Sequence, residues 1–205
     1  MATVKLTKNE LKKQKDNLKQ FERYLPTLQL KKQQLQMVAM QVAEEIDEKE
    51  SAQQKMMEDM ENWVAVFSEN TSFGDAYKIE NLIRPDKVIC KDRNIAGVIV
   101  PAFEELTFQE ISYSVSDYPL WVDKALVRLR EIARLRAIIQ TLKKEMELIN
   151  RELRLTSQRV NLFEKVKIPE TKENIRVIEI YLGDMQTAAV VRGKIAKNKR
   201  QGASA

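Results

Sequence analysis

The chain has 205 residues, of which 32% are charged and 6% aromatic, and its formal net charge is +5. Glycine and proline, five of each, are too sparse for a many-stranded sandwich or barrel, which needs a turn about every 8–12 residues. The absence of histidine from the sequence excludes His-based catalytic triads and most zinc sites. This composition is typical of long helices with a wide polar face and a narrow apolar seam.

The basic residues gather toward both ends of the sequence. Residues 1–35 contain nine Lys/Arg and three Asp/Glu, and residues 190–205 contain five Lys/Arg and no acid. Such residues either keep helices soluble or form a basic surface for an acidic protein, lipid or nucleic acid. Aromatic residues near these ends are few, and two of them, Phe21 and Phe163, lie on apolar seams. We therefore do not expect nucleic-acid binding.

The first predicted element is one long N-terminal helix. Thr7 and Glu10 have the spacing of a capping box, and apolar residues then alternate in steps of three and four from Leu18 to Phe67. This repeat predicts a coiled-coil helix within residues 1–68. An interior proline, Pro26, predicts a kink nearby, with a break into two helices as the alternative.

Residues 69–118 differ in kind from the flanking segments, because they are rich in turn-forming and β-branched residues. Two apolar runs within residues 87–101, separated by Asp92-Arg93-Asn94, predict a short β-hairpin with its turn at those three residues. We also expect short helices in this segment. Cys90 is the single cysteine, and its apolar neighbours predict a buried side chain.

A second heptad-patterned helix is predicted over residues 119–199. Its apolar series is strict from Leu135 to Phe163 and resumes after Pro169 displaced by one position. This slip predicts a kink or local rewinding near Pro169. Residues 200–205 are expected to be disordered.

Together these elements predict a mainly all-α fold in which the N- and C-terminal segments form a long antiparallel two-helix coiled coil. The central hairpin would lie at one end of an elongated rod, and the two basic chain ends would meet at the other. The N-terminus lacks a secretory signal, and no run approaches the ~20 apolar residues of a membrane span, so a soluble, reducing compartment is expected. No phosphate-binding loop or nucleophile motif is present in the sequence, and we expect neither catalysis nor a cofactor.

Three segments resemble the D subunit of V-type and A-type ATPases/ATP synthases. They are residues 25–35 (LPTLQLKKQQL), residues 93–101 (RNIAGVIVP), and residues 158–164 (QRVNLFE) followed by Ile168-Pro169 and Asn174-Ile175. The similarity covers nearly the whole chain. Pro26 departs from the family's N-terminal motif, and Phe163 stands directly before the glutamate of its C-terminal signature.

This resemblance implies a non-catalytic central rotor shaft that transmits torque between the catalytic hexamer and the membrane ion-translocating ring. The implied partners are the catalytic A and B subunits, a small central-stalk F subunit and the membrane ring connector subunit. The chain would be cytoplasmic and would contact the membrane only through the complex. The residues expected to bind the catalytic hexamer are Lys8, Lys12, Lys13, Lys15, Arg192, Lys194 and Lys197. Those expected to bind stalk subunits are Val88, Arg93, Asn94, Ile95, Val98 and Val100.

The alternative that the sequence leaves open is a stand-alone coiled-coil adaptor or tether with a basic tip. Co-purification from native membranes distinguishes the two, because a rotor subunit brings ATPase subunits with it.

Overall fold

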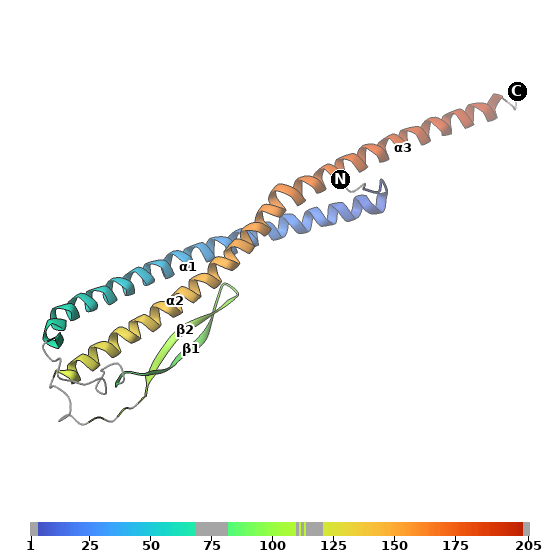
Figure 1. The fold of residues 1–205 in the computed structure, drawn as a ribbon. Coiled ribbons are helices and arrows are strands. Elements are labelled where there is room, and N and C mark those ends of the chain that lie inside the picture. The colour runs from blue at the N-terminus through green and yellow to red at the C-terminus, as the bar shows by residue number, and fades with distance from the viewer. Residues whose placement is uncertain (1–3, 69–81, 110, 112, 114–120, 203–205) are drawn as a thin grey trace. The chain divides into compact units, whose positions relative to one another are not determined.

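The computed structural model describes residues 4–68, 82–109, 111, 113 and 121–202, and it is mostly helical with one central two-stranded antiparallel hairpin (Figure 1). This confirms the predicted fold class. The elements are α1 (Lys8–Ser68), β1 (Pro85–Ile95), β2 (Val98–Phe108), α2 (Val122–Leu162), the π-helical turn η4 (Phe163–Lys167) and α3 (Ile168–Gly202). Two compact units are present: a terminal unit of Met1–Lys32 with Leu155–Ala205, and a central unit of Gln33–Arg154.

Helix α1 begins at the predicted cap. The backbone N–H of Glu10 donates to Thr7 Oγ1 at 3.3 Å, while the Glu10 carboxylate accepts from Gln14 Nε2 at 2.8 Å instead of returning to the cap. The helix runs through Pro26 without ending, and the hydroxyl of Thr27 donates to the carbonyl of Tyr24 at 2.7 Å. The capping box therefore sets the start of the helix, and Pro26 does not divide it.

In the terminal unit the first part of α1 pairs with α3 in antiparallel fashion. Lys15 Nζ lies 2.6 Å from Glu179 Oε1, and Lys172 Nζ lies 3.2 Å from Glu22 Oε1. A step of seven residues forward on α1 is therefore a step of seven backward on α3. The seam beside these ion pairs buries side chains of α2 and α3: Thr156, Val160, Thr171 and Ile178.

The π-helical turn accounts for the one-position slip of the apolar pattern. In an α-helix the seam after Phe163 would pass through residues 170, 174 and 177, whereas Thr171 and Ile178 are the buried residues and Ile175 is half-buried. A π turn closes i→i+5 hydrogen bonds and so accommodates one extra residue. Pro169 follows at once and has no N–H for an α-helical bond, which makes a π turn at this position less costly.

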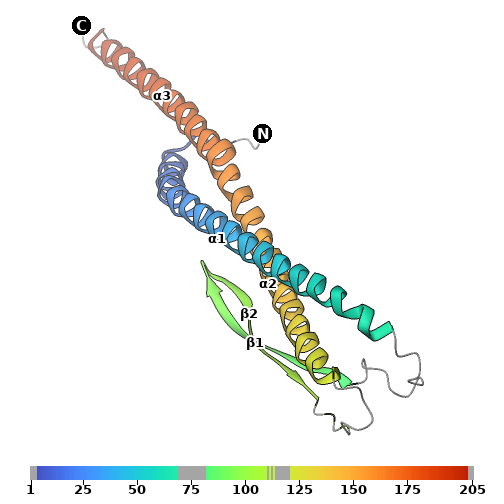
Figure 2. The same ribbon diagram turned by 90° about the vertical axis from the view of Figure 1, so that its left-hand side faces the viewer.

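The central unit is built on a three-part core. Leu35 and Val42 of α1, Ile149 of α2 and Val100 of β2 form one buried cluster, and Lys143 Nζ ties α2 to Glu50 Oε1 of α1 at 2.7 Å. The hairpin lies alongside α2 in two perpendicular views (Figures 1 and 2). It thus packs on the helix pair, as an isolated two-stranded hairpin must in order to be stable.

The hairpin turn lies two residues beyond the predicted one. Residues 92–94 continue strand β1, Ile95 pairs with Val98, and the turn residues are Ala96 and Gly97. Both have positive φ, 49° and 81°, which a two-residue type I′ turn requires. Asn94 Oδ1 accepts from the Gly97 N–H at 2.9 Å, so the asparagine supports the turn from outside it.

A second, smaller cluster surrounds the start of α2. Leu82, Val122 and Leu126 are buried there, with Trp121 and Tyr113 packed against them, and the Tyr113 hydroxyl donates to the Asp123 carboxylate. The short helices expected between the hairpin and the long helices lie outside the described residues. Among the helices that the structure describes, none combines the length and apolar character that a membrane span needs.

Candidate partner-binding surfaces

The four lysines predicted on the first turns of α1 are exposed, but they are not equivalent. Lys8, Lys12 and Lys13 precede the ion pair that Lys15 makes with Glu179. Because that pair is itself exposed, it contributes little stability. It nevertheless directs the Lys15 ammonium toward α3. Lys15 is therefore engaged within the helix pair, and the other three carry the positive surface.

The basic residues at the end of α3 do not lie beside those of α1. Lys8 stands about two turns before Lys15, so the residue opposite it is near Gln186, given the pairing of Lys15 with Glu179. Arg192, Lys194 and Lys197 lie further along α3, which continues to Gly202 (Figure 1). The predicted meeting of the two basic ends is wrong in this respect, because α3 extends past the start of α1.

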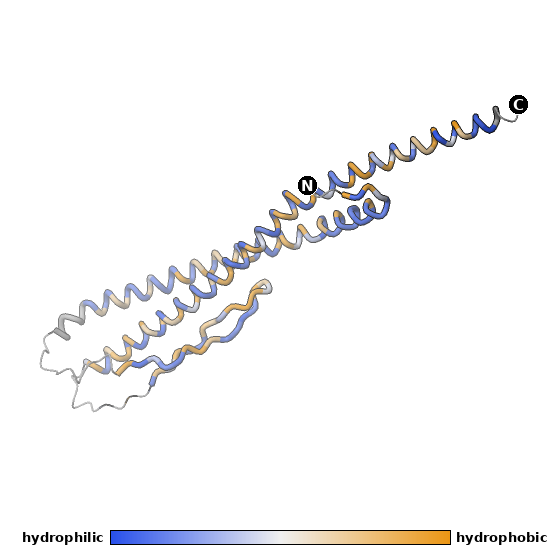
Figure 3. Tube along the Cα trace, turned by 45° about the vertical axis from the view of Figure 1, so that its right-hand side comes forward, coloured by the Kyte–Doolittle hydropathy of each residue, from blue (hydrophilic) through white to orange (hydrophobic). Residues whose placement is uncertain are grey.

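The end of α3 beyond α1 is exposed on all sides. Every residue from Gly183 to Arg200 is exposed, and residues 186–202 include five Lys/Arg and no acid. Apolar residues are interspersed among the polar ones (Figure 3), and Val190, Val191 and Ile195 are each about half exposed. Val191 and Ile195 are four residues apart and therefore share one side of the helix with Val190 next to them, so this end of α3 has an exposed apolar face that a partner could cover.

Of the hairpin residues predicted to bind stalk subunits, three are used inside the chain. Val100 is 0% exposed, and Ile95 and Val98 pack against the same cluster of α1 and α2 side chains. The hairpin turns these three side chains toward its own helices, and their role as contact residues stays a prediction. The sequence shows that they are apolar but not which surface they cover.

The other three predicted hairpin residues differ from one another. Arg93 Nη2 donates to Glu145 Oε1 of α2 at 2.7 Å, and Asn94 supports the turn. Val88 is exposed. Cys90, predicted to be buried, is exposed as well, with its Sγ 4.0 Å from Thr141 Oγ1 of α2. The cause is that β1 is exposed along nearly its whole length.

Several exposed apolar residues are missing from the predicted contact residues: two lie off the heptad seam of α1, and one lies in the hairpin. Ile99 at the hairpin tip is 65% exposed, and Met37 and Met40 on α1 are 62% and 66% exposed. A search for apolar residues outside the heptad positions would have found the two methionines. These residues extend the surface that a partner could cover.

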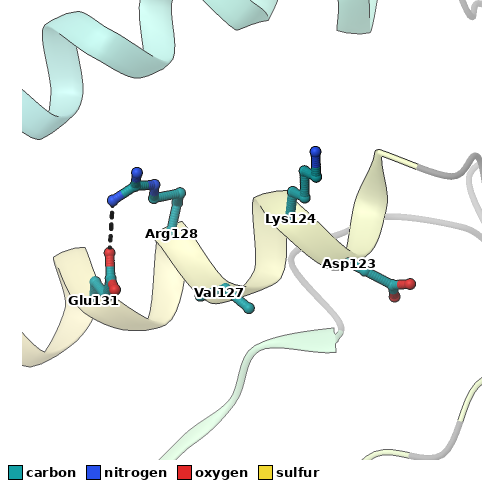
Figure 4. A pocket seen from close by; sticks show the side chains of 5 residues that line it. All are labelled: Asp123, Lys124, Val127, Arg128 and Glu131. Atoms are coloured by element: carbon teal, nitrogen blue, oxygen red, sulfur yellow. Dashed lines mark hydrogen bonds and ion pairs between the residues drawn. The ribbon is translucent and has the colours of Figure 1, made fainter.

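A shallow pocket lies on the first turns of α2 (Figure 4). Lys124 and Arg128 project to one side of the helix, and Arg128 Nη1 lies 3.1 Å from Glu131 Oε2. Asp123 accepts from Tyr113. Three of the four charged side chains that line the pocket thus engage neighbours, and the four do not converge on one point. No group of three potential metal ligands occurs among the described residues.

One carboxylate of α3 has a perturbed pKa. A hydrogen bond from Arg176 lowers the pKa of Glu173 from its ordinary value, and the same bond raises the pKa of Arg176. The Nε and Nη2 atoms of Arg176 reach the carboxylate at 2.9 and 2.7 Å. This pair lies fully in water, so we interpret it as local support for α3 and not as a reactive site.

Comparison with known proteins decides the family. Residues 10–198 match the family of ATP synthase D subunits. The chain belongs to this family. It is 50% identical over 198 residues to the D subunit of the V-type ATP synthase of Borreliella burgdorferi, covering 97% of this chain and 95% of that one. It is 37% identical over 203 residues to the corresponding D subunit of Chlamydia felis, covering 98% and 95%.

A member of the D-subunit family is a component of a rotary ATPase and works with other subunits of that complex. The predicted resemblance is thereby confirmed, and the stand-alone adaptor loses its support. The surfaces described above are therefore candidate contacts within a V-type ATP synthase.

Proposed function

We propose that this chain is the non-catalytic central rotor shaft of a V-type ATP synthase. It transmits torque between the catalytic hexamer and the membrane ion-translocating ring, on the cytoplasmic side of the membrane. ATP is bound and turned over by the surrounding catalytic A and B subunits, whereas this chain supplies a stiff and asymmetric axle.

The proposal rests mainly on the exposure and composition of the C-terminal end of α3. It is exposed throughout, basic, and apolar at Val190, Val191 and Ile195. An exposed apolar face flanked by basic residues suits a helix that is covered by a partner. The bore of a ring of subunits offers such surroundings, and acidic side chains in the ring would attract Arg192, Lys194 and Lys197.

Stiffness is the second requirement of a shaft. Helix α1 has 61 residues, a contour length of about 90 Å, and it is cross-linked by ion pairs to its neighbours within each unit. Lys15–Glu179 and Lys172–Glu22 serve the terminal unit, and Lys143–Glu50 serves the central one. Each pair is weak alone, but together with the buried seam they resist sliding of one helix along the other.

We propose further that the small F subunit and the ring connector bind the central unit. The exposed side chains Val88, Ile99, Met37 and Met40 offer apolar area for such contacts. In this proposal Val88 and Ile99 replace the inward-facing hairpin residues as the contact points.

The proposal is tested by reversing charge at the end of α3. In the triple variant Arg192→Glu/Lys194→Glu/Lys197→Glu we expect the affinity of the chain for the catalytic subunits to fall at least tenfold. ATP-driven ion transport by the reassembled complex should fall with it. Binding and transport that both stay unchanged would contradict the proposal.

The matched control reverses three exposed lysines elsewhere on the chain: Lys55, Lys124 and Lys144. This variant has the same change in net charge, so a general electrostatic effect would lower binding equally in both. We expect the control to keep at least half of the binding of the unaltered chain.

A further inference from the structure

The helical strand of the terminal unit that runs through the end of α2 and through α3 carries a second heptad series beside its buried seam. Each member of this series directly precedes a residue of the apolar series that forms the buried seam, so the two series run side by side. We call it the outer seam, and its members are Leu155, Arg159, Leu162, Glu170, Asn174, Val177, Tyr181, Asp184 and Ala188.

The apolar members of the outer seam are not covered by α1. Leu155 is 40% exposed, Leu162 46%, Val177 42% and Tyr181 40%. In a two-stranded coiled coil the positions beside the apolar core are usually charged. A second apolar series is instead typical of a helix that packs against two neighbours, of which α1 is one.

The side of α3 opposite the outer seam is already engaged. Lys172 and Glu179 directly follow buried residues of α3, and they pair with Glu22 and Lys15 of α1. The outer seam precedes the buried residues and so lies on the other flank of the helix pair. A second neighbour would therefore pack on the outer seam.

Two charged residues of the outer seam make no ion pair within the part of the chain that the structure describes. They are Arg159 and Asp184, and both are exposed. The third charged member, Glu170, pairs with Lys167 at 3.3 Å. Arg159 lies toward one end of the outer seam and Asp184 toward the other, so the charges of the seam match those of the same seam running in the opposite direction.

We propose that the second neighbour is another copy of this chain, packed antiparallel along the outer seam about a twofold axis. A twofold contact uses the same surface of both copies. Arg159 of each copy then lies opposite Asp184 of the other, and both unpaired charges of both chains are compensated. The contact extends over about 50 Å of helix.

The alignment that pairs Arg159 with Asp184 also places apolar residues opposite one another. These further pairs are Leu155 with Ala188, Leu162 with Tyr181, and Val166 of the π-helical turn with Val177. Near the twofold axis, the amide of Asn174 lies opposite the carboxylate of Glu170 and can donate to it. The outer seam is therefore complementary to itself in shape of pattern as well as in charge.

This dimer is a state of the free chain, and the inference does not rest on the proposed rotor function. In the proposed rotor the ring of catalytic subunits would enclose α3, so the dimer and the assembled complex would exclude each other. The dimer would thus cover the apolar outer seam until the chain is assembled.

Sedimentation equilibrium of the purified full chain tests the proposal. We expect a monomer–dimer equilibrium with a dissociation constant in the micromolar range. Asp184→Arg places like charges opposite each other at both ends of the contact, so it should raise the dissociation constant at least tenfold. Arg159→Asp should do the same for the opposite reason.

A mixture of these two variants separates the proposed pairing from a general loss of structure. In a heterodimer of one Asp184→Arg chain and one Arg159→Asp chain, opposite charges meet at both ends. Its dissociation constant should therefore lie within threefold of that of the unaltered dimer. The matched control is Asp16→Arg, an exposed position of α1 with the same change in net charge, and it should stay within twofold.

Three results would overturn the proposal. One is an unaltered chain that stays monomeric at about 1 mM, which would leave the outer seam to a different partner. Another is a dimer that Asp184→Arg does not weaken more than Asp16→Arg does. The third is a mixture of the two single variants that forms no heterodimer.

Discussion

Phe21 of α1 and Phe163 of η4 contact each other with ring centroids 5.2 Å apart and ring planes inclined at 52°. The contact joins the N-terminal helix to the π-helical turn, at the point where the apolar pattern slips by one residue. Aromatic pairs in such tilted arrangements contribute about 0.5–1.5 kcal/mol beyond the area that they bury.

Replacing either ring by leucine should remove this pairwise term while keeping most of the apolar volume. We expect a coupling energy of about 1 kcal/mol between Phe21→Leu and Phe163→Leu in a double-mutant cycle. Urea unfolding of the four full-length chains gives the measurement. Additive effects of the two substitutions would show that the rings do not interact.

The π-helical turn should tolerate the loss of one residue. Deleting Val166, which is exposed, closes the turn into an α-helix and joins the two halves of the apolar series. Pro169→Ala is included in the background, because proline would clash with an α turn. We expect the free energy of unfolding to change by no more than about 1 kcal/mol relative to that background.

The matched deletion removes Val177, an exposed residue outside the π turn. It rotates the rest of α3 by about 100° and puts Glu179 in the place of the fully buried Ile178. Loss of such a side chain from the seam typically costs about 2–5 kcal/mol. Equal stability of the two deletion variants would contradict our account of the slip.

Removal of the Thr156 hydroxyl should raise the free energy of unfolding of the chain. It is 0% exposed, and its Oγ1 has no hydrogen-bond partner among the described residues. Thr156→Val keeps the shape and relieves the unmet desolvation of the hydroxyl, which is a gain of up to about 1–2 kcal/mol.

Thr171 provides the control, since it is buried too but its Oγ1 donates to the Lys167 carbonyl at 2.6 Å. Thr171→Val should lower stability by about 1 kcal/mol. Thermal unfolding of both variants, compared with the unaltered chain, shows whether the two effects have opposite signs as we expect.

Neighbouring residues of β2 should respond very differently to truncation. Val100 is 0% exposed and Ile99 is 65% exposed, so Val100→Ala should weaken hairpin docking by about 2 kcal/mol. Ile99→Ala should change it by less than about 0.5 kcal/mol. Amide hydrogen exchange of the hairpin reports its packing on the helices. Faster exchange in the Ile99 variant than in the Val100 variant would contradict our assignment of Val100 to the buried face of β2 and of Ile99 to the exposed face.

The sequence predicts features that depend on local periodicity and misses those that depend on long-range placement. The heptad series and the Thr7–Glu10 cap are encoded within a few residues, so the long helices were predicted. The turn at Ala96–Gly97 was missed, because a positive φ at alanine is rare and the neighbouring Asn94 carries the stronger turn signal.

The candidate site was harder to predict than the fold for the same reason. Apolar residues such as Ile95 and Val98 can face a partner or the chain's own helices, and only tertiary packing distinguishes the two. The Lys15–Glu179 pair shows how far α3 extends past α1, and nothing in either local sequence specifies that pairing.

Rotation of this chain within the assembled complex tests the central claim most directly. Cys90 is its single cysteine and is exposed, so a probe can be attached there in a complex whose other subunits lack reactive thiols. With the catalytic subunits held on a surface, the account predicts that the probe turns in one direction while ATP is hydrolysed, and stops when ATP is removed. A probe that keeps a fixed orientation during sustained ATP hydrolysis would contradict the proposal that this chain is the rotor shaft.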